Sequence, residues 1–426
     1  MKFITNIWNN LKEQPVLSGV SVTGTALAIF LIMVVVMMND VKIQSFPPES
    51  YRERMLYADY ASYYEIQNGP DRAINGGMSA RTAGKLYKDL EGAEAVSVYA
   101  TWLQNASVSA PGKAAAKVDV RGCDADFFKV FDYTFIDGKP FTEADLESEI
   151  CKAVITESVA RKVFGRTDVV GEEIGLSMAP YVVSGVVKDV SILTTKAYAD
   201  MWVPYTTFTQ RQMWDSQPNG MMAAIILAKE GVKLADVKKE CDRLFVKFNE
   251  ELATTGMQMI QRGRPYAQEQ ESVGVWSNEE PDVAPVRRQR MIILAILLLV
   301  PAINLSSMTQ SRLHQRRAEI GVKRAFGASR ARIISEIFAE NIVVTLVAGL
   351  VGYLLSVGFA LIYGSELFTS SSPKIMTSAS SVNLSVLIHV STLMWALLFC
   401  LLLNVISTGI PVWQAARVNV VNAIKG

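Results

Sequence analysis

Residue types that carry nucleophilic or metal-dependent chemistry are scarce in this chain. Its two histidines, His314 and His389, lie in a short basic segment and in an apolar stretch, so residues 39–290 contain none. A Ser-His-Asp arrangement, a Cys-His pair or a histidine-bound zinc therefore cannot be built in that region from this chain. Asp and Glu are scattered, and no spacing marks two of them as an acid/base pair. We expect no catalytic residues and no metal site.

A phosphate-binding loop is excluded in a similar way. The nearest match is GMSARTAGKL at Gly77–Leu86, where the two glycines are seven residues apart and a P-loop needs five. Leu86 also stands where a P-loop has the Ser or Thr that holds Mg²⁺. We therefore expect no cofactor bound by this chain. If ATP supplies energy, a separate subunit must bind it with Mg²⁺ and hydrolyse it.

Charge and cysteine usage narrow the class further. The net charge of +1 argues against a nucleic-acid partner, because the basic residues cluster in one segment and acids balance them elsewhere. Cys123, Cys151 and Cys241 fall in residues 39–290 and show no C-x-x-C spacing. Three cysteines neither require nor exclude a disulfide there.

The segment 312–340 is basic and patterned like a helix. It contains seven Arg or Lys residues and only three acidic residues, with apolar residues between the charged ones. A short loop this basic belongs on the cytoplasmic side of a membrane. Gly327 predicts a break in the helix, and Ser329 is a plausible N-cap for a new start. We expect a short helix along the membrane surface.

The chain contains four uncharged apolar stretches that are each at least 18 residues long. They are Val16–Met38, Met291–Met308, Asn341–Gly364 and Leu384–Ile410. At 1.5 Å rise per residue, each reaches about the 30 Å of a hydrocarbon core. We predict a multi-pass membrane protein with four transmembrane α-helices and a large α+β extracytoplasmic domain inserted between helices 1 and 2.

The predicted order follows from these spans, with both termini in the cytoplasm. It is an interfacial amphipathic helix (1–15), transmembrane helix 1 (16–38), the extracytoplasmic domain (39–290), transmembrane helix 2 (291–311), the cytoplasmic basic loop or helix (312–340), transmembrane helix 3 (341–364), a short outer loop (365–383), transmembrane helix 4 (384–410) and a cytoplasmic tail (411–426). The outer domain interleaves short strand-like pieces, among them Ala153–Thr156 and Tyr181–Val187, with helix-like pieces such as Leu234–Leu252. We therefore expect two lobes with a break near residues 205–222.

Two features of the spans suggest how they pack. Small residues recur every four positions in the third span, at Ala348, Gly352, Ser356 and Ala360, and such a stripe lets another helix approach closely. In the second span, Pro301 permits a kink. A hinge at Pro301 and simple packing are equally compatible with the sequence.

The basic segment resembles the coupling loop of the MacB/FtsX-like permease family, which has the form R-R-x-E-I-G-x-x-R-A-x-G-A-S. The positions concerned are Arg316, Arg317, Glu319, Ile320, Gly321, Arg324, Ala325, Gly327, Ala328 and Ser329, with Lys323 just before Arg324. The stretches Ala125–Leu146, Ala153–Gly165 and Tyr181–Val190 resemble the family's periplasmic core domain, and the tail from Pro411 resembles its closing pattern.

This resemblance implies a permease subunit of an ABC transporter in the bacterial cytoplasmic (inner) membrane. It implies that Arg316, Arg317, Glu319, Ile320, Lys323, Arg324, Ala325, Gly327, Ala328 and Ser329 couple to a separate ABC ATPase subunit. It also implies a homodimer or a heterodimer with a close paralogue, surrounded by membrane lipid.

The sequence leaves the function of the extracytoplasmic domain open. Export or efflux of an unidentified substrate is the first expectation, with a periplasmic adaptor and an outer-membrane channel as further partners. An FtsX-like regulator that activates a cell-wall hydrolase by mechanotransmission is the alternative. A membrane receptor with no ATPase partner is a third reading.

Overall fold

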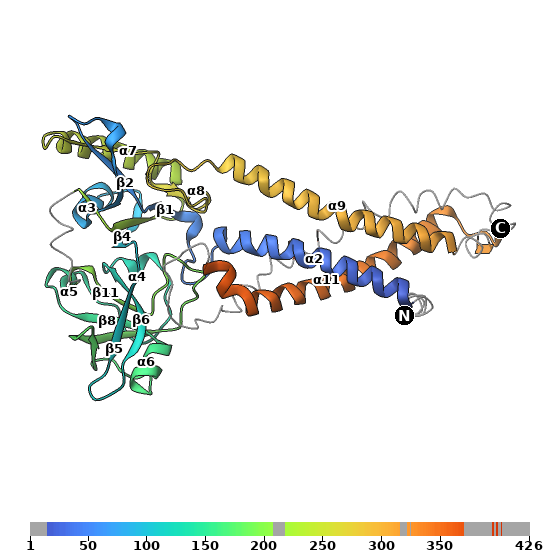
Figure 1. Ribbon diagram of the computed structural model, residues 1–426, viewed down its shortest axis with the longest axis horizontal. Helices are drawn as coiled ribbons and strands as arrows, with labels where there is room; N and C mark the ends of the chain where they lie inside the picture. The colour runs from blue at the N-terminus through green and yellow to red at the C-terminus, as the bar shows by residue number, and fades with distance from the viewer. Residues whose placement is uncertain are drawn as a thin grey trace. The chain divides into compact units, whose positions relative to one another are not determined.

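The structure, a computed structural model, describes residues 15–207, 218–315, 322–323 and 325–369 and the single positions 394, 395, 398 and 402. The chain divides into two units. The helical unit contains the described residues up to Val41 and Pro285–Gly364. The second unit contains Lys42–Ala284, which we call the head, together with the described residues that follow Gly364 at the end of the long last helix. Figure 1 shows the elements of both, coloured along the chain.

The described part of the helical unit consists mainly of three long helices, α2 (Pro15–Ile43), α9 (Val283–Gln315) and α11 (Arg330–Thr369). Val22–Ile43 and Ile342–Tyr363 are long and apolar enough to cross a membrane. α9 contains the predicted span Met291–Met308, whereas the span 384–410 lies almost entirely outside the described residues. The structure therefore supports two spans, and the count of four stays a prediction.

α11 begins before the apolar stretch. We expected a short surface helix after Ser329 and a span from Asn341, but one continuous helix runs from Arg330 to Thr369. Ser329 Oγ accepts a hydrogen bond from the Arg332 N–H at 3.3 Å and caps this helix. Because residues 330–340 contain no Gly or Pro, no residue there interrupts the helix before the apolar stretch.

Lobe 1 of the head is a sheet covered by two helices. Its elements are β1 (Met55–Ala58), β2 (Ala61–Glu65), β3 (Ile74–Met78), α3 (Ala80–Tyr87), β4 (Ala93–Ala100), β12 (Asn219–Gly220), β13 (Met222–Ala228), α7 (Leu234–Ala253), β14 (Met257–Ile260) and β15 (Tyr266–Ala267). The antiparallel order β4-β13-β1-β15, with α3 after β1 and α7 after β13, is that of a split β-α-β unit. The two helices pack on the sheet through buried side chains such as Leu86 of α3 and Val237 of α7, which belong to the core of this lobe.

Lobe 2 is inserted between β4 and β13. Its elements are β5 (Gln104–Ser109), β6 (Ala116–Cys123), α4 (Phe127–Val130), β7 (Phe135–Gly138), α5 (Glu143–Glu147), β8 (Lys152–Thr156), α6 (Glu157–Phe164), β9 (Glu173–Leu176), β10 (Ala179–Val187) and β11 (Met201–Pro204). The pairings β5-β6-β11-β8-β10-β9-β5 close into a barrel. Val120, Ile155 and Val183 lie in its buried interior.

The chain passes twice between the lobes. One passage, after β11, falls in the predicted region 205–222. The other lies between Ala100 of β4 and Gln104 of β5 and was not predicted. The sequence between β4 and β5 has no linker rich in turn-forming residues, so it gives no sign of a boundary between the lobes.

Candidate functional site

The predicted coupling residues are only partly covered by the structure. Arg316, Arg317, Glu319, Ile320 and Arg324 lie outside the described residues, whereas Lys323, Ala325, Gly327, Ala328 and Ser329 are described. The part that can be seen is a tight turn before α11. The N–H of Ala328 donates to the carbonyl of Lys323 at 3.0 Å. Gly327 has φ +90°, a left-handed conformation that glycine adopts readily at the end of a helix.

This turn presents apolar side chains to its surroundings. Phe326 is 88% exposed and Val322 is 48% exposed. Lys323 Nζ lies 2.9 Å from Glu336 Oε1, which ties the turn to the first part of α11. Both charged side chains are about two-fifths exposed, so this pair is worth at most about 1 kcal/mol. Phe326 occupies a variable position of the family motif and Glu336 follows the motif, so neither was among the predicted coupling residues.

The predicted packing residues line one face of α11. Ala348 and Ser356 are fully buried, and Ala360 is 5% exposed. At Gly352, an added Cβ would lie 2.6 Å from the carbonyl oxygen of Ala26 in α2. The backbones of α2 and α11 are therefore in direct contact at this glycine, which is the close approach that small residues permit.

The hinge prediction at Pro301 is not tested. Pro301 lies within α9, which is assigned as helix from Val283 to Gln315. Its side chain is outside the described residues, so the hinge stays a prediction.

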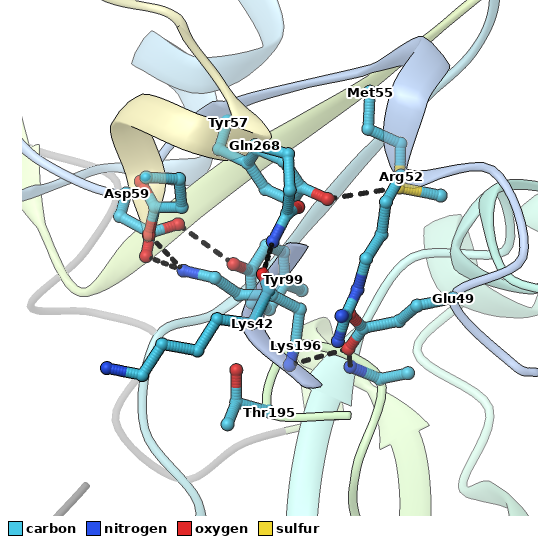
Figure 2. Close-up of polar contacts among 12 residues, drawn as sticks. Lys42, Glu49, Arg52, Met55, Tyr57, Asp59, Tyr99, Thr195, Lys196 and Gln268 are labelled. Atoms are coloured by element: carbon cyan, nitrogen blue, oxygen red, sulfur yellow. Dashed lines mark hydrogen bonds and ion pairs between the residues drawn. The ribbon is translucent and has the colours of Figure 1, made fainter. Parts of the chain in front are cut away.

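A cluster of charged residues in the head was not found from the sequence. Figure 2 shows part of this polar junction, which we define as Glu49, Arg52, Asp59, Lys196 and Glu271. Glu49 and Arg52 follow α2, and Asp59 lies between β1 and β2. Lys196 is in the loop 188–200 between β10 and β11 of lobe 2, and Glu271 ends α8 (Gln268–Glu271). Four separate segments thus meet at one place.

Glu49 and Arg52 anchor the segment that follows α2. Their side chains form a buried pair, with Arg52 Nε 2.7 Å from Glu49 Oε2. Glu49 Oε1 also accepts from the backbone N–H groups of Lys196 and Ala197, both at 3.0 Å. The Arg52 guanidinium lies 4.3 Å from the centroid of the Phe46 ring. Because both charges are almost fully buried, removing either partner would cost about 3–5 kcal/mol.

Lys196 holds the second part of the junction together. Its ammonium group pairs with Asp59 and lies 2.7 Å from Glu271 Oε1. Asp59 Oδ1 accepts from the Tyr99 hydroxyl at 3.0 Å (Figure 2). Burial by itself opposes the charged form of Lys196, but the Asp59 and Glu271 carboxylates outweigh it and hold the pKa of Lys196 well above its usual value.

The two carboxyl groups respond to this ammonium differently. Burial would raise the pKa of Asp59, but the charge and hydrogen bond of Lys196 prevail and lower it. Burial, followed by the Asp59 charge, raises the pKa of Glu271 to about 7. One lysine thus keeps Asp59 ionised, while Glu271 titrates near neutral pH.

α8 brings the segment before α9 to the same junction. Gln268 Nε2 donates to the Lys42 carbonyl at 2.6 Å, and Lys42 is in the last turn of α2. Just before α8, Tyr266 and Ala267 form β15 and pair with β1. The two segments that join the head to α2 and α9 therefore contact each other and the lobe 2 loop.

Arg121 supports this loop from inside lobe 2. It lies on β6, is 3% exposed, and donates to the carbonyls of Ala100, Thr195 and Tyr198 at 2.9–3.2 Å. Ala100 ends β4 at one passage between the lobes. Arg121 therefore fixes the loop that carries Lys196 relative to lobe 1.

Metal chemistry has no geometric support in the part of the chain that the structure describes. No group of three or more His, Cys, Asp or Glu side chains there could hold a metal ion. The polar junction is a set of ion pairs and hydrogen bonds that holds four segments of the head together.

Comparison with known proteins gives two family matches. Residues 18–244 match the MacB-like periplasmic core domain, and residues 291–420 match the FtsX-like permease C-terminal domain. The macrolide export ATP-binding/permease protein MacB of Escherichia coli strain K12 and that of Shigella flexneri are each 25% identical over 237 residues, which is 55% of this chain and 34% of theirs. The chain thus spans about a third of the length of these curated relatives.

Solved structures with low sequence identity are also similar. The extracellular domain of the ABC-type transporter YknZ from Gram-positive bacteria has 17% identity and a TM-score of 0.33, covering 47% of this chain and 99% of that one. The periplasmic region of MacB from Actinobacillus actinomycetemcomitans has 15% identity and a TM-score of 0.35, covering 49% and 88%. Because the periplasmic core domain match alone covers more than half of the sequence and the permease match follows it, the chain belongs to the MacB/FtsX-like ABC transporter permease family.

Proposed function

We propose that this chain is the transmembrane subunit that carries ATP-driven conformational change from a separate ABC ATPase subunit to the head, for export of an unidentified substrate. In this proposal the ATPase binds ATP and Mg²⁺ and docks on the cytoplasmic segment around Lys323–Ser329. The chain has four membrane helices, both termini in the cytoplasm, and works as a homodimer or a heterodimer with a close paralogue.

The polar junction carries this proposal. Gln268, in the segment that leads to α9, contacts the Lys42 carbonyl in the last turn of α2, and in this proposal a change in the separation of the two helices acts on that contact. Both segments are also tied to the lobe 2 loop, through Glu49 and through Glu271. A relative movement of the two helices would therefore be passed to the position of lobe 2 against lobe 1, which is a two-state rearrangement of rigid parts.

The exposed turn before α11 supports the cytoplasmic half of the proposal. Phe326 and Val322 are large, exposed apolar side chains in the turn that also carries Lys323, whose ammonium group pairs with Glu336. Exposed aromatic anchors surrounded by charges are typical of protein-binding sites. An ATPase surface is the partner that the family membership favours.

Co-purification tests the proposal. The full-length chain, tagged and extracted in mild detergent, is expected to recover an ABC ATPase from its native host, identified by mass spectrometry. A variant with Val322→Ala and Phe326→Ala should recover much less of it, at equal membrane abundance. If the unaltered chain recovers no ATPase, the result contradicts the proposed transporter function and favours a membrane receptor with no ATPase partner.

Export and hydrolase activation give different results once an ATPase partner is found. Reconstituted with its ATPase, an exporter should show ATP hydrolysis that responds to a transported compound. A regulator of a cell-wall hydrolase should instead bind that enzyme through the head and raise its peptidoglycan cleavage only when ATP is present. The family membership is compatible with both, and the head's connection to two membrane helices serves either.

A further inference from the structure

Two carboxyl groups share one ammonium group in the polar junction. Lys196 Nζ pairs with Asp59 and lies 2.7 Å from Glu271 Oε1. The pKa of each carboxyl also responds to the other carboxyl, so the two groups are close enough to interact. With all three groups ionised the cluster carries a net charge of −1 in a largely buried place, and the two carboxylates repel each other.

Four tyrosines are among the described groups whose pKa responds to the charge of Glu271. They are Tyr57 on β1, Tyr60 after Asp59, Tyr99 on β4 and Tyr266 on β15. Burial raises the pKa of each one above its usual value, so they stay neutral near pH 7. The state of the cluster at neutral pH is therefore set by the Glu271 proton.

Solvent can supply and remove this proton. The Glu271 side chain is 20% exposed, and that of Lys196 is 17% exposed. A protonated Glu271 can donate a hydrogen bond to Asp59, which leaves a neutral cluster with one ion pair. An ionised Glu271 loses that hydrogen bond and faces the Asp59 charge directly.

We propose that α8 is a proton-controlled latch, in which protonated Glu271 holds α8 against Asp59 and Lys196 and ionised Glu271 weakens that hold. The position of α8 gives the latch its effect. Gln268 in the same helix contacts the Lys42 carbonyl, and the chain continues from α8 to α9. Opening the latch therefore separates the segment that leads to α9 from the segment that follows α2.

The direction of the pH response follows from linkage. A released α8 leaves Glu271 in water with a pKa near its usual value of 4.5, whereas the closed latch raises the pKa to about 7. The closed latch therefore binds the proton more tightly, and rising pH favours release. These two values give an increase of about tenfold in the release equilibrium between about pH 6 and about pH 8.5.

The functional consequence rests on the proposed function. If the head lies outside the membrane and receives force through α2 and α9, acid conditions outside would stiffen the connection and alkaline conditions would loosen it. The latch itself needs neither an ATPase nor a substrate, so it is tested separately.

Hydrogen–deuterium exchange of the full-length protein in detergent tests the latch. Peptides covering residues 266–277 are compared between the unaltered chain and Glu271→Gln at the same series of pH values. The ratio of their exchange rates cancels the intrinsic pH dependence of amide exchange, because both proteins have nearly the same local sequence. The exchange rate of these peptides in the unaltered chain, divided by the rate in Glu271→Gln, should rise about tenfold from about pH 6 to about pH 8.5, with its midpoint near pH 7.

Two controls make the result specific. Glu280→Gln removes a charge from the exposed segment after α8, and it should keep the pH response of the unaltered chain. Peptides from β5 in the barrel should show a ratio that is independent of pH. A flat ratio for residues 266–277, or an equal loss of the response in Glu280→Gln, overturns the latch. Either result leaves the proposed role with an ATPase untouched.

Discussion

Lys196 and Glu271 are 75 residues apart in the sequence, yet their charged atoms lie 2.7 Å apart. One comes from the inserted barrel lobe and the other from the segment that leads to α9. Their contact joins the inserted lobe 2 to the segment of the head that precedes α9 in the chain. The polar junction therefore connects the inserted lobe to two segments of the head that are far from it in the sequence.

Replacing Lys196 with Met should destabilise the head. The change leaves Asp59 and Glu271 facing each other without a cation, in a site where Lys196 is 17% exposed. Loss of one partner from such a largely buried cluster costs about 3 kcal/mol. We expect a clear decrease in the Tm of the full-length protein in detergent, measured by monitoring thermal unfolding through tryptophan fluorescence.

The matched control for this change is Lys239→Met. Lys239 is 74% exposed and pairs only at the surface of α7 with Asp236, at 3.1 Å. Surface pairs of this kind contribute about 0–1 kcal/mol, so the Tm should hardly move. Equal shifts for the two variants would show that the junction adds no stability beyond that of a surface pair.

Local periodicity predicted much of the head. The expected strands Ala153–Thr156 and Tyr181–Val187 correspond to β8 and β10, and the expected helix Leu234–Leu252 corresponds to α7. These segments bury one face against a core, so their apolar residues recur with the period of the element. Their ends differ from the prediction by no more than two residues.

Long-range pairing could not be predicted in the same way. Closure of the barrel depends on the parallel pairing of Val120 in β6 with Met201 in β11, and neither strand alone shows which partner it takes. The polar junction was missed for a related reason. In the sequence Asp59, Lys196 and Glu271 look like ordinary surface charges, because charged residues are usually exposed and only the fold brings these three together.

Asp200 should make the stability of the head depend on pH in the acid range. Burial raises its pKa to about 6 from a usual value of 3.8, although its Oδ2 accepts from the Asp119 N–H at 2.9 Å. The folded state therefore binds this proton more tightly than the unfolded state, and the contribution is lost as pH rises from about 4 to about 6. The Tm of Asp200→Asn minus that of the unaltered chain should increase across this window. A constant difference would contradict the prediction.

Phe326 should contribute strongly to binding of the ATPase. An aromatic side chain that is 88% exposed in the free chain gains the most by burial in a partner. Phe326→Ala should weaken the affinity of a purified ATPase partner about tenfold or more, measured by titration against the full-length protein in nanodiscs. Trp276→Ala in the head is the control, since Trp276 is 74% exposed but belongs to the other unit. The same loss in both variants would argue against a docking role for the turn at Phe326.

Gly352→Ala should loosen the contact between α2 and α11. The new Cβ would lie 2.6 Å from the Ala26 carbonyl oxygen and 3.1 Å from the Ile29 side chain, so the backbones must move apart. Overpacking of this kind costs about 1–3 kcal/mol, and it should lower the Tm of the detergent-solubilised protein. Gly358→Ala, on the same helix, is the matched control because its Cβ would meet nothing within 4 Å. Replacing a helical glycine with alanine at such an open position should hold the Tm or raise it slightly. If both variants lower the Tm equally, the small-residue face of α11 is not a contact surface for α2.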